Sequence, residues 1–277
     1  MVLLSASSAW AADEGNGLDG KAIGTLTGTV LICLVIYALY LYLKPLIFDR
    51  TSGLKWAALL LLAIGIVKIA LVPLFPGLGI DVGSYEAWAM RLVDVGPAGT
   101  YRPGYFLDYP PGYLYALWAA GSLARALGAT GDAMRLIVEG PALFADFVLG
   151  LLLFAMVRRN VRDPRLAWIG MLLFALNPAL LFDTLAWGQS DSVPALLMLL
   201  SMAMVLDEEF ELGWALAAMA ALVKPQALMF LPVLGWWTLL RGRIAQWVAS
   251  AIVFLTVGFL LILPFQLGES SWTWIFS

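Results

Sequence analysis

Carboxylates are the groups of this chain that could do acid–base chemistry, because the sequence contains no histidine. A Ser-His-Asp triad and a histidine zinc site are therefore excluded. The single cysteine, Cys33, lies in an apolar run and is expected to be a small buried hydrophobe, so no disulfide or cysteine-based metal motif is predicted. Any proton transfer would fall to an aspartate or a glutamate.

Two motifs that carry such carboxylates precede short helical patterns. Asp81 follows an apolar run, and the helical pattern after it contains Tyr85, Glu86 and Trp88. Asp108 begins an extended segment fixed by two prolines, Asp108-Tyr109-Pro110-Pro111. Each carboxylate could instead cap the helix that follows it, through hydrogen bonds from the first free backbone N–H groups. Both interpretations stay open at this point.

Two further motifs interrupt long apolar segments. Asn177-Pro178 lies inside one of them, and the turn that follows carries Asp183, Trp187, Gln189 and Asp191. Three polar side chains within the nine residues 183–191 exceed what helix capping requires. A break at Lys224-Pro225 places one cation beside Gln226, where it could bind an anion or pair with an aspartate of the preceding turn.

The composition indicates that lipid is the solvent of this chain. Of its 277 residues, 62% are hydrophobic and only 13% are charged, which is more apolar surface than one water-soluble core of this length can bury. The net charge is −3, and the 16 Lys and Arg residues fall in short clusters between apolar runs. This pattern argues against a nucleic-acid-binding surface and predicts an integral membrane protein.

About eight apolar segments are expected to cross the membrane as helices, so the predicted fold class is all-α, a polytopic transmembrane bundle. Five segments have the length needed to cross ~30 Å of hydrocarbon: residues 22–43, 54–75, 133–157, 164–182 and 244–263. Three shorter ones are interpreted as short or tilted spans: residues 192–206, 212–223 and 226–240.

Basic residues set the expected orientation of the bundle. They cluster in three loops, which the positive-inside rule places in the cytoplasm: Lys44, Arg50 and Lys55; Arg158, Arg159, Arg162 and Arg165; and Arg241 and Arg243. Residues 113–127 then cannot cross, because a crossing there would move the most basic loop outside. We expect them to form an interfacial or re-entrant helix in a long extracytoplasmic loop. All four polar motifs fall on the extracytoplasmic side, which predicts one site.

The two ends of the chain carry weaker signals. Residues 1–21 are interpreted as an extracytoplasmic segment that includes the tail of a signal peptide, because Ala9-Trp10-Ala11 suits signal peptidase. Residues 22–277 are expected to form a single transmembrane domain, since no repeat or linker divides them. The aromatic stretch at residues 272–276 has no closing element after it, so the domain is expected to continue beyond residue 277.

The ordered set of motifs resembles the GT-C superfamily of integral membrane glycosyltransferases. Within it, the chain is most similar to the bacterial proteins related to the second GPI mannosyltransferase and to the dolichyl-phosphate-glucose-dependent glucosyltransferases. The resemblance covers about residues 54–264 and is carried by the Asp81 motif, Asp108-Tyr109-Pro110-Pro111, the turn from Asn177 to Asp191, and Lys224-Pro225-Gln226. Members of the family usually continue for several more spans, and the span at residues 22–43 has no counterpart in the shared core.

The resemblance implies an enzyme of the bacterial inner membrane whose active site faces the periplasm or the exterior. Such enzymes transfer a hexose, here mannose by preference, from a polyprenyl phosphate to a hydroxyl of a glycan, lipid or protein acceptor, with inversion. Asp81 is then the general base. Substrate-binding groups are expected at Tyr85, Glu86, Trp88, Asp108, Tyr109, Asp183, Trp187, Gln189, Asp191, Lys224 and Gln226. No metal or other cofactor is expected, although Asp81, Asp108 and Asp191 could hold a divalent cation.

Two other classes of function fit parts of this pattern. A transporter or lipid flippase would also have broken helices with charges at membrane depth, but it would usually show repeated halves, and this sequence has no internal repeat. A non-catalytic partner in the assembly of envelope glycans would tolerate changes of Asp81 and Asp108.

Overall fold

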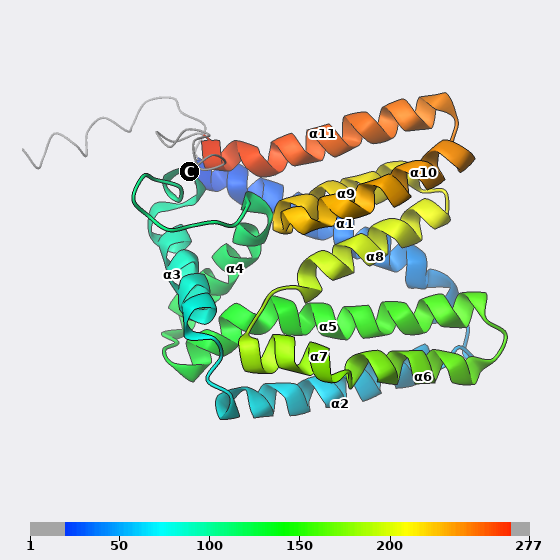
Figure 1. The fold of residues 1–277 in the computed structure, drawn as a ribbon, viewed down its shortest axis with the longest axis horizontal. Coiled ribbons are helices and arrows are strands. Elements are labelled where there is room, and N and C mark those ends of the chain that lie inside the picture. The colour runs from blue at the N-terminus through cyan, green and yellow to red at the C-terminus, as the bar shows by residue number, and fades with distance from the viewer. Residues whose placement is uncertain (1–19, 267–277) are drawn as a thin grey trace, which may run out of the picture.

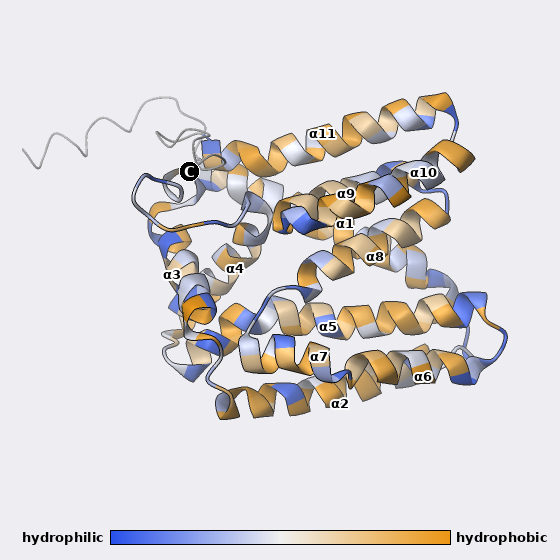
Figure 2. Ribbon diagram, viewed as in Figure 1, coloured by the Kyte–Doolittle hydropathy of each residue, from blue (hydrophilic) through white to orange (hydrophobic). Residues whose placement is uncertain are grey.

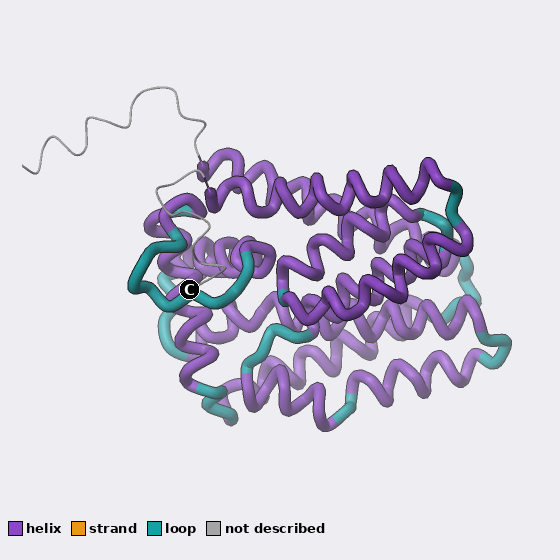
Figure 3. The backbone as a smooth tube through the Cα atoms, turned by 45° about the horizontal axis from the view of Figure 1, so that its top comes forward, coloured by secondary structure: helices purple, strands orange, loops and turns teal. Residues whose placement is uncertain are grey.

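The computed structural model describes residues 20–266, and every regular element in that range is a helix (Figure 3). The α-helices are α1 (Gly20–Phe48), α2 (Leu54–Leu71), α3 (Gly79–Val95), α4 (Pro111–Leu127), α5 (Asp132–Asn160), α6 (Pro164–Ala175), α7 (Pro178–Leu181), α8 (Ser192–Leu206), α9 (Phe210–Val223), α10 (Leu231–Arg241) and α11 (Ile244–Gln266). Short 3₁₀ turns are η1 (Val72–Leu74), η2 (Pro97–Gly99) and η4 (Pro225–Phe230), and η3 (Phe182–Trp187) is a turn of π-helix.

Five of the helical segments are long and apolar enough to cross a membrane, which confirms the prediction of a multi-pass, all-helical membrane protein. They are Gly20–Phe48, Leu54–Leu74, Asp132–Asn160, Pro164–Trp187 and Ile244–Gln266. Each covers one of the five long predicted spans, except that the second ends one residue before the predicted end at residue 75. Figure 2 shows the apolar residues along these helices and the hydrophilic ones gathered in the loops at the two ends. The predicted signal-like segment up to residue 19 and the aromatic stretch 272–276 lie outside the described residues.

The helices form a bundle around α5 and α9. Helix α5 packs against α2, α4, α6 and α8, while α9 packs against α8, α11 and α4. The close approach of α8 and α9 depends on Gly213, where a Cβ atom would lie 3.0 Å from the backbone oxygen of Ser201. Small residues at such contacts let membrane helices pack backbone to backbone. Cys33, expected to be buried, is exposed on α1, because this helix presents most of its surface outward like the other peripheral helices.

Helices α3 and α4 lie across one end of the bundle rather than along it (Figure 1). Helix α4 matches the predicted interfacial segment closely and begins at Pro111, which suits the first position of a helix. Two glycines let α4 approach its neighbours: Gly121 faces the backbone of Ala89 on α3, and Gly112 faces the backbone of Leu222 on α9. Helix α4 therefore fixes the position of α3 relative to the end of α9.

The ends of α8 and α9 nearest α3 stop short of the ends of α5 and α11 (Figure 1). Their 15 and 14 residues correspond to lengths of about 22 and 21 Å, against ~30 Å for the hydrocarbon layer. Helix α9 ends because Lys224 precedes Pro225 and adopts the extended conformation that this position favours (φ −144°, ψ 128°). Asp191 precedes α8 and Lys224 follows α9, so both lie at these short ends.

Candidate functional site

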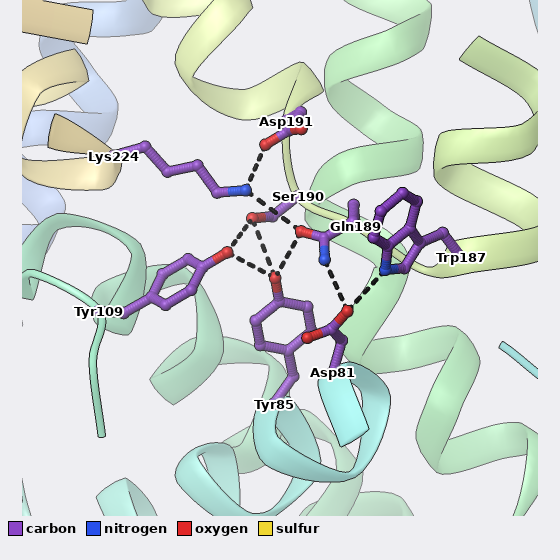
Figure 4. A network of polar contacts seen from close by, with 8 residues as sticks. All are labelled: Asp81, Tyr85, Tyr109, Trp187, Gln189, Ser190, Asp191 and Lys224. Atoms are coloured by element: carbon purple, nitrogen blue, oxygen red, sulfur yellow. Dashed lines mark hydrogen bonds and ion pairs between the residues drawn. The ribbon is translucent and has the colours of Figure 1, made fainter. Parts of the chain in front are cut away.

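Asp81 lies in the first turn of α3 and is bonded to groups from a distant segment (Figure 4). Its Oδ2 atom accepts hydrogen bonds from Trp187 Nε1 at 2.6 Å and from Gln189 Nε2 at 2.8 Å. The alternative interpretation, that Asp81 caps the helix, is wrong, because α3 begins two residues earlier and no side chain caps it. Within the described residues, Oδ1 of Asp81 receives no hydrogen bond and stays available.

The amide of Gln189 connects Asp81 to a lysine (Figure 4). Its nitrogen donates to Asp81, while its Oε1 accepts from Tyr85 Oη and from Lys224 Nζ, each at 3.2 Å. This orientation of the amide is the one that satisfies both charged neighbours, since only the nitrogen can donate to a carboxylate. A carboxylate and an ammonium group are thereby held on opposite sides of one side chain.

Two tyrosine hydroxyls and a serine complete the network. The Tyr85 and Tyr109 hydroxyls lie 2.7 Å apart, and Ser190 Oγ lies 3.5 Å from each. Burial raises the pKa of Tyr85 far above its usual value, so its hydroxyl stays neutral and keeps its proton. The Tyr85 ring makes edge-to-face contacts with Trp88, Tyr109 and Tyr113 at centroid distances of 5.6–5.7 Å. Trp88 is buried behind this ring and supports the network instead of joining it.

Lys224 also forms an ion pair with Asp191 (Figure 4). The lysine side chain is 13% exposed and that of Asp191 57%, so the pair has one buried and one open member. The Nζ atom also lies 5.4 Å from the centre of the Tyr109 ring, a cation–π contact. The ion pair that the sequence left as an alternative is therefore present, and the carboxylate of Asp191 is its exposed member.

The turn between η3 and α8 positions Trp187, Gln189 and Asp191. One turn of π-helix, Phe182–Trp187, ends at Gly188, whose φ of +84° favours glycine. The backbone N–H groups of Gly188 and Gln189 both donate to the carbonyl of Asp183 at 3.0 Å. π-Helical turns are frequent at functional sites because they redirect a few side chains within a helix.

A cavity of about 490 Å³ lies beside the Lys224–Asp191 pair, between α8 and η4. Asp191, Lys224 and Gln226 line its polar end. The remaining lining follows α8 and η4 and is apolar: Pro194, Ala195, Met198, Leu199, Met202, Ala227 and Phe230. This combination fits an amphiphile with one anionic group and a hydrocarbon chain.

Besides Trp88, and Gln226, which lines the cavity, three of the predicted site residues do not join the polar network. Asp108 is exposed and forms no hydrogen bond or ion pair with a described residue, and Pro110, not Asp108, is the N-cap of α4. Asp183 contributes its backbone carbonyl to the turn, while its carboxylate has no hydrogen bond in the described range. Glu86 lies on another face of α3, where burial raises the pKa of its carboxyl and Arg135 opposes that rise.

Two buried ion pairs next to the site were not predicted. Lys68 on α2 bonds Asp146 on α5 at 2.8 Å, and Asp146 also accepts from Ser192 at the start of α8. Arg135 bonds Glu139 one turn along α5 at 2.7 Å. The signal that could have found them is an ionisable residue inside an apolar run, which is rare in a membrane span and usually has a partner.

No protein-family model matches the chain, and no curated protein matches it either.

Proposed function

We propose that this protein is an integral membrane glycosyltransferase that moves a hexose, mannose by preference, from a polyprenyl phosphate to an acceptor hydroxyl, with inversion. One observation carries the proposal. A single amide, that of Gln189, joins a carboxylate with a free oxygen to a lysine at the polar end of an apolar cavity. Base and phosphate-binding cation are the two groups that such a transfer requires.

In the proposed reaction, Oδ1 of Asp81 accepts the proton of the acceptor hydroxyl. The hydroxyl oxygen forms a bond to the anomeric carbon of the donor sugar, and the bond from that carbon to the phosphate oxygen breaks on the opposite face. Trp187 and Gln189 hold Oδ2, so the other oxygen of Asp81 is directed to the acceptor. The anionic phosphate leaves toward Lys224, assisted by the amide of Gln226.

The cavity beside Lys224 is the proposed place of the donor's polyprenyl chain. Its apolar walls suit an isoprenoid, and its polar end places the phosphate beside Lys224. The phosphate would take the place of Asp191, the exposed member of the ion pair. The reaction as proposed needs no metal, because its leaving group is a monophosphate.

The proposed topology has eight crossings with both ends of the described chain outside, in the bacterial inner membrane. Gly20 at the start of α1 lies near Pro264 at the end of α11, beside Ala98 of the loop after α3. An even number of crossings is needed to return to the same side, whereas five long segments alone would be odd. The three shorter passes α8, α9 and η4–α10 make up the difference, which supports the count of eight. The site then faces the periplasm or the exterior.

Incubation of the purified protein with radiolabelled polyprenyl-phosphate mannose and, separately, glucose tests the proposal. Consumption of one donor with release of free polyprenyl phosphate, absent in Asp81→Asn, is the expected result. Movement of the intact donor between leaflets without cleavage would instead assign a flippase. Binding without cleavage or movement would indicate a non-catalytic partner.

A further inference from the structure

The strongest unassigned feature is the buried guanidinium of Arg135 on α5. It makes contact with three separate parts of the chain, although its side chain is only 7% exposed. Nε donates to Glu139 Oε1 at 2.7 Å, and Nη2 donates to the carbonyl of Leu185 in η3 at 3.1 Å. Nη1 donates to the carbonyl of Phe75, with the carbonyl of Val72 at 3.4 Å.

Two of the carbonyls that Arg135 binds, those of Phe75 and Leu185, belong to the segments that carry the site. Phe75 ends the α2–η1 segment, and the chain reaches Asp81 six residues later. Leu185 lies two residues before Trp187 in the π-helical turn. The two segments also bond directly, since the Leu78 N–H donates to the carbonyl of Trp187 at 2.9 Å. Arg135 thus satisfies carbonyls at the base of both segments whose side chains meet at Asp81.

Two glycines with positive φ rest on the two members of the Arg135–Glu139 pair. A Cβ atom on Gly77 (φ +74°) would lie 3.3 Å from the Arg135 guanidinium carbon. One on Gly188 (φ +84°) would lie 2.7 Å from Glu139 Oε1. Either atom would also come within 2.8 Å of Val82. The turn before α3 and the turn after η3 are therefore packed against one ion pair at distances that only glycine permits.

From these contacts we infer that Arg135 is a positioning residue, which with Glu139 sets the orientation of the Asp81 carboxylate relative to its donors Trp187 and Gln189. The inference deepens the proposed function, and only its kinetic consequence rests on that function. Lysine cannot replace the guanidinium, because one ammonium group cannot reproduce a planar fork that reaches acceptors on three elements. Arg135→Lys keeps the positive charge in the protein interior but removes the fork. The turn before α3 and the turn after η3 are then free to shift against each other.

The first test measures the geometry without catalysis. The full chain is labelled with 5-fluorotryptophan, and the ¹⁹F resonance of Trp187 is identified as the one missing in Trp187→Phe. Asp81→Asn changes the hydrogen bond of the indole and should move this resonance. Arg135→Lys should move or broaden it too, whereas Arg125→Lys should not. Arg125 is the matched control, since it pairs with Asp94 on the surface at the same end of the molecule.

The second test is kinetic. Arg135→Lys should lower kcat by about 10²-fold, the usual effect of a misplacement near 1 Å. The KM for the lipid donor should change less than threefold, because none of the hydrogen-bond partners of Arg135 lines the cavity. In an Asp81→Asn background, Arg135→Lys should lower kcat little further, since Arg135 acts through Asp81.

An unchanged Trp187 resonance in Arg135→Lys would overturn the inference, as would an equal kinetic loss with and without Asp81. If Arg135→Lys does not fold, Glu139→Gln replaces it in both tests, because glutamine keeps an acceptor for Nε and removes only the charge. A wild-type protein that turns over no lipid donor would contradict the proposed function alone, and the ¹⁹F measurement would still decide the role of Arg135.

Discussion

Asp81 and Lys224 are coupled without touching each other, because both bond the side chain of Gln189. The amide presents its nitrogen to the carboxylate and its oxygen to the ammonium group. A change at either charge therefore alters the hydrogen bonding of the other. This arrangement suits a reaction in which a proton arrives at one side as an anion leaves at the other.

Asp81→Asn should lower turnover of the lipid donor by about 10²–10⁴-fold, the usual contribution of a general base. The thermal midpoint should stay near that of the wild type, because the oxygen of asparagine can still accept from Trp187 and Gln189. Asp94→Asn on the exposed side of α3 is the control and should keep its turnover. Full activity of Asp81→Asn would remove Asp81 as the base, and loss of folding would assign it a structural role.

Lys224→Met should raise the KM for the donor by about 10–100-fold, as expected for a lost hydrogen bond to a charged group of ~1.5–3 kcal/mol. The protein should still fold, since Asp191, the partner left behind, is mostly exposed. Lys55→Met at the other end of the bundle serves as control. Initial rates over a range of donor concentrations give both constants, and an unchanged KM would exclude Lys224 from phosphate binding.

Lys68→Met should destabilise the protein by about 3–5 kcal/mol, because it leaves a buried carboxylate without its cation. The double variant Lys68→Met, Asp146→Leu should recover most of this loss, although Ser192 then lacks its acceptor. Unfolding in detergent, followed by heat or denaturant, measures both. Equal stability of the single and double variants would contradict an ion pair at this position.

Glu86→Gln should raise stability at pH 7, and the advantage should shrink as the pH falls. Burial raises the folded-state pKa of Glu86, so the charged form opposes folding once the pH rises through that pKa. At acidic pH both side chains are neutral and the difference disappears. Thermal midpoints of the two proteins between pH 4 and pH 8 give the comparison, and a variant that is less stable at pH 7 would contradict the prediction.

The topology predicts that a cysteine at position 108 reacts with an impermeant maleimide added outside, while one at position 160 does not. Asp108 and Asn160 are both exposed at opposite ends of the bundle, so each replacement is accessible from one side only. The background is Cys33→Ser, which removes the natural thiol. The reverse labelling pattern would place the site on the cytoplasmic side. It would contradict the proposal that the lipid donor reaches the site from the extracytoplasmic side.

The long helices could be predicted from the sequence because length and hydropathy are local properties. The partners of Asp81 could not, since they lie more than a hundred residues away and depend on how α3 packs against the turn before α8. Helix phase explains one outcome: Tyr85 is four residues after Asp81 and shares its face, whereas Glu86 is one step further and turns toward Arg135.

Charges at membrane depth reveal part of the site from the sequence alone. Lys224 and Asp191 stood out because they interrupt apolar segments at a proline and at a turn. Arg135, Glu139, Lys68 and Asp146 lie within continuous helices, where nothing local separates a structural pair from a site. Only the contacts across helices reveal that one of these pairs lies under the Asp81 turn.

The position of the cavity between α8 and η4 has a consequence for how the lipid donor reaches the site. Leu228 and Met229 of η4, the segment that lines one side of the cavity, are exposed. A lipid-linked donor could thus arrive by diffusion within one leaflet, and its spent carrier could depart the same way without desorbing. The encounter rate would then follow the density of donor per area of membrane, and would be insensitive to the volume of the compartment outside.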